Sequence, residues 1–286
     1  IPQGDWSSDV CSSDLKNWDM DKLEWLTGEV CRIARKAGHF LKEERKNFRR
    51  EAVEQKNAHD YVSYVDKESE RRVVSALRAL LPEAGFITEE GSADYHEEPC
   101  CWVVDPLDGT TNYIHDVAPY CVSIALRNRD ELLLGVVYEP VRDECFYAWK
   151  GGGAYLNGDR MQVSDVASLD DAYVVVELPY NARQYAPTAQ HLIQQLYGKV
   201  AAIRMNGSAA LALCYVAAGR YDAWLEAFIG KWDFSAAALM IQEAGGRVTD
   251  FKGNIMFLEG HHIVATNGAL HDTFLEVIQE CLPEGL

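Results

Sequence analysis

The stretch 102–113, W-V-V-D-P-L-D-G-T-T-N-Y, constrains the fold of this chain more than any other. Its first three residues are apolar and two are β-branched, which predicts a buried strand. Asp105-Pro106 is expected to end that strand, because proline has no N–H for the ladder and biases the preceding residue away from helix. We therefore expect Asp105 at the carboxyl end of a strand, where α/β sheets commonly bind ligands.

A turn rich in hydrogen-bond donors follows this strand. Asp108 and Gly109 form a tight turn, and the three residues after Gly109 supply hydroxyl, amide and backbone N–H groups that can hold an anion. Two carboxylates three residues apart beside such a turn suggest a divalent cation bridging to phosphate, and Mg²⁺ suits these oxygen ligands. The alternative for D-P-x-D-G alone is a solvated acidic turn without a ligand.

Charge and cysteine usage exclude several classes of protein. The 286 residues carry a formal net charge of −17, which argues against a protein that coats nucleic acid or binds an anionic membrane, so neither partner is expected. No apolar run approaches the roughly 18 residues of a membrane span. The eight cysteines include no C-x-x-C pair, which predicts reduced thiols in a cytoplasmic protein without a zinc site or disulfide framework.

The beginning of the chain does not resemble the rest. Residues 1–15 repeat Ser-Ser-Asp and lack the charged and apolar regions of a signal peptide. We therefore predict a non-native or disordered leader over residues 1–19, with Met20 as the natural start. From Asp21 to Leu41, apolar residues recur at three- and four-residue intervals, which predicts an amphipathic helix.

The remainder of the first half alternates between a further helix and several strands. Residues 56–66 are expected to form a polar loop leading into a helix from about Asp66, with Asp66 as its N-cap and Glu68 and Glu70 favoured by the helix dipole. Strand-like runs over 85–88, 121–127, 132–138 and 144–149, with turn signals such as Asn157-Gly158, predict a mostly antiparallel sheet.

The second half shows an α/β pattern. Strands are predicted over 172–177, 200–204, 223–226, 247–250 and 263–265, and helices over 188–197, after Gly207-Ser208, and over 274–281. Asp233 is expected to N-cap a further helix of small residues, which Gly245 closes in a left-handed conformation. The residues alone thus predict an α+β half over 20–165, followed by an α/β half over 166–286.

Two stretches resemble the signatures of the inositol monophosphatase family of Mg²⁺-dependent, Li⁺-sensitive phosphatases. The first is residues 102–115, and the second is W-D-F-S-A over residues 232–236, where Ser235 replaces the alanine usual in the family. The resemblance extends over about residues 20–280. It implies a layered αβαβα sandwich, with an antiparallel-sheet half followed by a smaller α/β half and the site between them, and it implies a homodimer.

The resemblance also implies roles for individual residues. The resemblance implies a site for roughly two or three Mg²⁺ ions. Its expected ligands are Glu89, Asp105, the Leu107 carbonyl, Asp108 and Asp233. The implied catalytic residues are Glu89 and Thr110, which would orient the attacking water, and Asp66, which would support Thr110 by a hydrogen bond. The residues expected to bind substrate are Asp108, Gly109, Thr110, Thr111, Gly207, Ser208, Ala209, Glu226 and Asp233.

The implied reaction is hydrolysis of a small phosphorylated polyol, with an inositol 1- or 4-monophosphate as the expected substrate. Nucleotide 3′-phosphates such as 3′-phosphoadenosine 5′-phosphate, histidinol phosphate and fructose 1,6-bisphosphate are alternatives, because such phosphatases share the metal ligands and differ in the substrate wall. Pro179 and Tyr180, where relatives often carry Gly-Ser, could narrow that wall or stack on a base. An alternative of a different class is a regulatory protein that binds the transcription or ribosome machinery.

Overall fold

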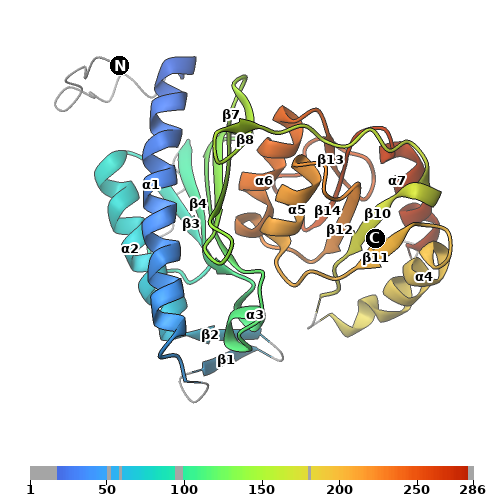
Figure 1. Ribbon diagram of the computed structural model, residues 1–286, viewed down its shortest axis with the longest axis horizontal. Helices are drawn as coiled ribbons and strands as arrows, with labels where there is room; N and C mark the ends of the chain where they lie inside the picture. The colour runs from blue at the N-terminus through green and yellow to red at the C-terminus, as the bar shows by residue number, and fades with distance from the viewer. Residues whose placement is uncertain (1–17, 50–52, 58–59, 94–98, 180–181, 283–286) are drawn as a thin grey trace.

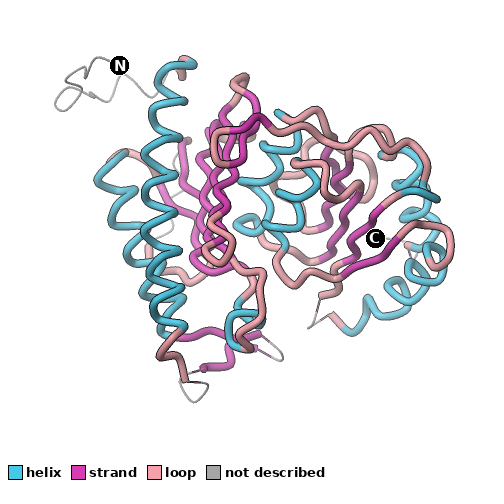
Figure 2. The backbone as a smooth tube through the Cα atoms, viewed as in Figure 1, coloured by secondary structure: helices cyan, strands magenta, loops and turns pink. Residues whose placement is uncertain are grey.

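The computed structural model describes residues 18–49, 53–57, 60–93, 99–179 and 182–282. These residues form five layers in the order helices, sheet, helices, sheet, helices (Figure 1). Figure 2 shows the two groups of strands separated by a helical layer. The αβαβα sandwich expected from the sequence is therefore confirmed.

The first half contributes an outer helical layer and a seven-stranded sheet. The outer helices are α1 (Met20–Arg45) and α2 (Tyr64–Leu80), and a short helix α3 (Thr110–Ile114) follows the signature strand. The strands are β3 (Gly85–Thr88), β4 (Cys100–Asp108), β5 (Cys121–Asn128), β6 (Glu131–Glu139), β7 (Glu144–Trp149), β8 (Gly153–Leu156) and β9 (Asp159–Arg160). They neighbour one another in chain order, and all pairs are antiparallel except β3 with β4.

The second half contributes a mixed five-stranded sheet with helices on both faces. Its strands are β10 (Tyr173–Val176), β11 (Ala202–Arg204), β12 (Ala223–Ala227), β13 (Arg247–Asp250) and β14 (His262–Thr266), in the order β11-β10-β12-β14-β13. Strand β10 is parallel to β11 and β12, whereas β14 is antiparallel to β12 and β13. Helices α5 (Ala209–Ala217) and α6 (Lys231–Glu243) lie between the sheets, and α4 (Ala186–Leu196) and α7 (His271–Cys281) cover the outer face.

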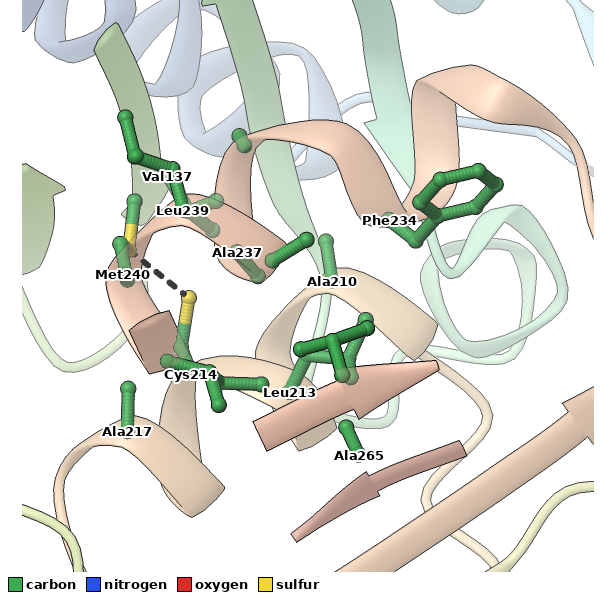
Figure 3. Close-up of a cluster of buried hydrophobic side chains, with 14 of the residues drawn as sticks. Val137, Ala210, Leu213, Cys214, Ala217, Phe234, Ala237, Leu239, Met240 and Ala265 are labelled. Atoms are coloured by element: carbon green, nitrogen blue, oxygen red, sulfur yellow. Dashed lines mark hydrogen bonds between the residues drawn. The ribbon is translucent and has the colours of Figure 1, made fainter. Parts of the chain in front are cut away.

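The central helices α5 and α6 belong to the core of both sheets. Every residue of α5 is buried, as expected for a helix that is apolar on all sides. Figure 3 shows α5 and α6 residues between Val137 of the first sheet and Ala265 of the second, with Cys214 Sγ 3.7 Å from Met240 Sδ. A Cβ at Gly135 would lie 2.3 Å from the Ala236 carbonyl oxygen, so glycine allows β6 and α6 to pack in direct backbone contact. The boundary at residue 165 stays a prediction.

The prediction of a loop over residues 56–66 is partly wrong. Strands β1 (Val53–Asn57) and β2 (Asp60–Ser63) pair antiparallel there. Their sequences V-E-Q-K-N and D-Y-V-S are short and mostly polar, so they lack the long alternating pattern that identifies a half-buried strand. Helix α2 then begins at Tyr64, immediately after this small sheet.

Two helix starts also differ from expectation. Ser63 is the N-cap of α2 and Gly230 the N-cap of α6, so neither Asp66 nor Asp233 has that role. Both aspartates occupy the third helical position, where the carboxylate accepts a hydrogen bond from the backbone N–H of the N-cap residue. The expected left-handed closure of α6 is confirmed, since Gly245 has a φ of +92°.

Most of the predicted leader lies outside the described residues. Asp19, one of its last residues, caps α1 by accepting a hydrogen bond of 2.8 Å from the Lys22 N–H. The seven cysteines within the described ranges carry free thiols. Among the described residues, no helix combines the length and apolar character needed to cross a membrane.

Candidate active site

A β-bulge in β4 brings Asp105 and Asp108 to the same face of the first sheet. Asp105 is paired with Ser123 and Asp108 with Cys121, so β4 has one residue more than β5 between these pairs. Residues three apart on a regular strand point to opposite faces, and one extra residue returns the second to the face of the first. The prediction that the strand ends at Pro106 is therefore wrong, because the bulge accommodates a residue without an N–H.

Three carboxylates converge at this point. Oxygens of Asp105, Asp108 and Asp233 lie within 4.8 Å of one another. Asp233 comes from the first turn of α6, which packs on the same sheet. Glu89 lies outside this group of three but immediately follows β3, whose parallel pairing with β4 places its N–H 3.2 Å from the Val104 carbonyl oxygen. The structure thus brings together three of the four acidic side chains expected to bind metal, and it places the backbone of the fourth, Glu89, at the end of the neighbouring strand.

Each of the three clustered carboxylates is oriented by hydrogen bonds to one of its oxygens. Asp105 Oδ1 accepts from the Leu107 N–H at 2.9 Å. Asp108 Oδ2 accepts from Ser208 Oγ at 2.5 Å and from the Ala210 N–H at 2.9 Å. The carboxylates are therefore held in place by the fold before any ligand binds.

The electrostatics of the cluster favour a cation. Burial raises the pKa of Asp105 well above its usual range, and the charges of Glu89, Asp108 and Asp233 raise it further. Burial also raises the pKa of Asp108. Bringing these carboxylates together in ionised form costs free energy, which a bound cation offsets. Since the donors are all oxygens, the cluster fits a hard divalent ion such as Mg²⁺.

The turn after the bulge carries the Thr110 hydroxyl. Gly109 adopts a φ of +87°, and Thr110 begins α3. Thr110 Oγ1 lies 3.0 Å from both Asp66 Oδ1 and the Leu107 carbonyl oxygen. Asp66 is fully buried, and its other oxygen accepts from the N–H and the hydroxyl of Ser63 at 2.9 and 2.6 Å. The expected hydrogen bond between Asp66 and Thr110 is therefore present.

Residues 206–208, called here the 206–208 loop, close on this turn from the second half. A Cβ at Gly109 would lie 3.2 Å from the Gly207 carbonyl oxygen and 3.3 Å from Ser208 Cβ. Asn112 Nδ2 donates to the carbonyl oxygens of Asn206, at 3.1 Å, and Pro119, at 2.8 Å. The predicted substrate residues Gly207 and Ser208, with Ala209 at the start of α5, thus lie beside the predicted phosphate turn, which includes Thr111 in α3.

Glu226 lies near the end of β12. Its pKa is raised well above the usual range by burial and by the charges of Glu177, Asp233 and Asp108, which places it among the acidic groups of the site. Of the two residues suspected of narrowing the substrate wall, Pro179 is half-buried, and Tyr180 lies outside the described residues.

Glu70, expected only to be favoured by the helix dipole, supports a neighbouring backbone segment. Its side chain is fully buried, and its two oxygens accept hydrogen bonds of 2.7 Å from the N–H groups of Glu90 and Ser92. Glu90 directly follows Glu89 and Ser92 lies two residues beyond it, so Glu70 fixes the segment after a predicted metal ligand. The available signal was its helical spacing of four from Asp66, which places both acids on one face of α2.

The layered sandwich is a phosphatase fold, and its carboxylate cluster could hold a metal ion. The chain belongs to the inositol monophosphatase family, whose family model matches residues 22–282. It is 43% identical to Nus factor SuhB of Pseudomonas aeruginosa over 265 residues, which cover 89% of this chain and 96% of the relative. Nus factor SuhB of Escherichia coli is 40% identical over 259 residues, with the same coverage.

Solved structures give the same result. The extragenic suppressor protein SuhB of Bartonella henselae superposes with a TM-score of 0.82 at 33% identity, covering 91% of this chain and 98% of its own. An inositol monophosphatase of Thermotoga maritima also has a TM-score of 0.82, at 32% identity, covering 92% and 98% of the two chains.

Proposed function

We propose that this protein hydrolyses phosphate monoesters with the help of Mg²⁺, and that its substrate is an inositol monophosphate. The observation that carries the proposal is the convergence of Asp105, Asp108 and Asp233 beside a turn whose N–H groups can hold an anion. Glu89 and the Leu107 carbonyl would complete the metal ligands. Bound Mg²⁺ would neutralise phosphate charge and supply a more acidic water.

The turn residues would orient the phosphate and the attacking water. Thr110 Oγ1 directs its proton toward Asp66 or the Leu107 carbonyl, so the hydroxyl oxygen can accept a hydrogen bond from the water. The N–H groups of Gly109 and Thr110 would donate to the phosphate oxygens as negative charge moves during in-line displacement. Glu89 would orient the same water from the end of the neighbouring strand β3.

Glu226 would select the leaving group. Its carboxylate can accept hydrogen bonds from polyol hydroxyls, and a site built to pair hydroxyls discriminates against ligands that lack them. The neighbouring Glu177 and Glu226 side chains offer carboxyl oxygens and not a cation to a second phosphate on the substrate. Both features support a polyol monophosphate over a bisphosphate or a nucleotide.

A phosphate-release assay tests this function. We expect release from inositol 1-phosphate with Mg²⁺ and none in excess chelator, and a lower kcat/KM for 3′-phosphoadenosine 5′-phosphate, histidinol phosphate and fructose 1,6-bisphosphate. Glu226→Gln should lower kcat/KM for inositol 1-phosphate. A preference of more than about tenfold for one of the other three substrates, about 1.4 kcal/mol, contradicts the substrate assignment.

A second candidate is a regulatory role beside the transcription machinery, supported by relatives at 40–43% identity that carry the name Nus factor SuhB. Such a role would require a surface that binds a partner protein, and it would not require metal binding at the active site. Binding to purified transcription components that survives Asp105→Asn would support it, and absence of binding by the wild type would exclude it. A homodimer in the cytoplasm remains our expectation, to be tested by sedimentation and cell fractionation.

A further inference from the structure

Glu177 lies next to Glu226 at the ends of two parallel strands. It directly follows β10, and its N–H donates to the Leu225 carbonyl oxygen of β12 at 3.0 Å. Side chains alternate along a strand, so Glu177 points to the same face as Val175, and Glu226 to the same face as Trp224. Val175 and Trp224 both pack in the core between the sheets, so the two glutamates project toward the active-site layer.

The Glu177 carboxylate holds the 206–208 loop by its backbone. Oε1 accepts hydrogen bonds from the N–H groups of Asn206, at 2.6 Å, and Gly207, at 3.1 Å. The side chain is only 6% exposed, so water has little access to replace these bonds. Removing the carboxylate would leave two backbone N–H groups without their acceptor. The present loop conformation would then cost free energy.

The held loop contacts the predicted phosphate turn directly. Its Gly207 carbonyl and Ser208 side chain pack on Gly109, and its Asn206 carbonyl accepts from Asn112 of α3. A shift of the loop would therefore move the predicted substrate residues Gly207 and Ser208 and loosen the packing on the turn. Displacements of about 1 Å at this range are enough to lower a rate by about two orders of magnitude.

We propose that Glu177 is a positioning residue, which fixes the 206–208 loop so that its backbone meets the hydroxyl groups of the leaving group. This inference rests on the proposed phosphatase function. It gives Glu177 a role distinct from that of Glu226, which would contact the substrate itself.

Amide hydrogen exchange in metal-free protein tests the positioning independently of activity. In Glu177→Ala, the amides of Asn206 and Gly207 should exchange at least about tenfold faster, because the hydrogen bonds that protect them are gone. Glu177→Gln keeps a carbonyl oxygen that can accept both bonds, so its exchange should stay close to wild type. The matched control is Glu243→Ala, since Glu243 accepts from the N–H groups of Gly151, in the turn after β7, and of Gly153, at the start of β8. That variant should leave the 206–208 loop unchanged.

Kinetics with two substrates separate positioning from general damage. Glu177→Ala should lower kcat/KM for inositol 1-phosphate about tenfold more than for phenyl phosphate, whose leaving group carries no further hydroxyl. Glu177→Gln should recover most of this difference. Equal losses on both substrates, or unchanged exchange at Asn206 and Gly207 in Glu177→Ala, would overturn the proposal. If the wild type releases no phosphate from any substrate, the phosphatase assignment fails, while the exchange result still decides whether Glu177 holds the loop.

Discussion

The Ser208 hydroxyl donates a hydrogen bond of 2.5 Å to Asp108 Oδ2, across a sequence separation of 100 residues. The same oxygen accepts from the Ala210 N–H. A carboxylate from the first sheet therefore provides an acceptor for one of the N–H groups that are left unpaired at the start of α5. One side chain therefore joins the predicted metal site to the position of a central helix.

We expect Ser208→Ala to destabilise the protein by about 1–3 kcal/mol, because a buried carboxylate loses a hydroxyl donor. Urea unfolding with chelator present measures this change without interference from bound metal. Ser235→Ala is the control, since Ser235 Oγ donates within α6, to the Lys231 carbonyl at 2.6 Å. It should change stability by less than about 1 kcal/mol. A Ser208→Ala protein as stable as wild type would show that the bond contributes little.

Asp105→Asn should have opposite effects in the absence and presence of Mg²⁺. Without metal, the substitution removes one of several mutually repelling buried charges, so the melting temperature should rise. With excess Mg²⁺ the wild type should gain stability by ligand binding, and the variant should gain much less and lose most of its activity. Thermal unfolding in chelator and in Mg²⁺ gives both values. A wild type that Mg²⁺ does not stabilise would contradict the assigned site.

Glu70→Ala should lower kcat/KM about 10- to 100-fold, although Glu70 is not expected to touch substrate. The reason is that the N–H groups of Glu90 and Ser92 lose their acceptor, so Glu89 is no longer fixed. Glu68→Ala on the same helix is the matched control, because Glu68 makes surface ion pairs with Arg71 and Arg72 of the same helix. Similar activities for the two variants would remove Glu70 from the supporting network.

His271 should make the protein less stable in acid. Thr249 donates its hydroxyl proton to the Asp250 carbonyl and so accepts from His271 Nε2–H, while the Thr266 hydroxyl can donate to Nδ1. This assignment describes a neutral ring. Burial, and to a smaller extent Arg247, lowers the pKa of His271 from 6.5 to about 4.

The direction of the pH effect follows from that shift. Between pH 6.5 and about 4 the unfolded chain binds a proton at this residue and the folded chain does not, so stability falls as pH falls, by up to about 3 kcal/mol. Urea midpoints of wild type and His271→Gln across this range isolate the contribution of His271 from that of the carboxylates. Parallel pH profiles for the two proteins would refute this assignment.

The fold was predictable where the hydrophobic pattern is long and regular. The apolar period of α1 and the runs of β5, β6 and β7 each identify an element with its approximate ends. The polar hairpin of β1 and β2 gave no such pattern. At the start of α2 and of α6, an acidic residue is favoured both at the N-cap and at the third helical position, for related electrostatic reasons. The sequence alone therefore did not show which of these two positions the aspartate occupies.

The site was predictable at the level of which residues belong to it. The signature stretches identified Asp105, Asp108 and Asp233, and the structure brings them together. What the sequence did not contain was the bulge that turns Asp105 and Asp108 to one face, because a bulge depends on the register with β5. Glu70 and Glu177 were also missed as supports, since their partners are backbone N–H groups of distant segments.

The placement of α5 and α6 between the two sheets has a consequence for dividing this protein. A break in the chain near residue 165 would leave the first sheet with one face bare and both central helices on the other fragment. Neither fragment would close a core alone, because the helices need a sheet on each side. The two fragments should regain activity only by reassembling, so this protein is suited to fragment complementation experiments.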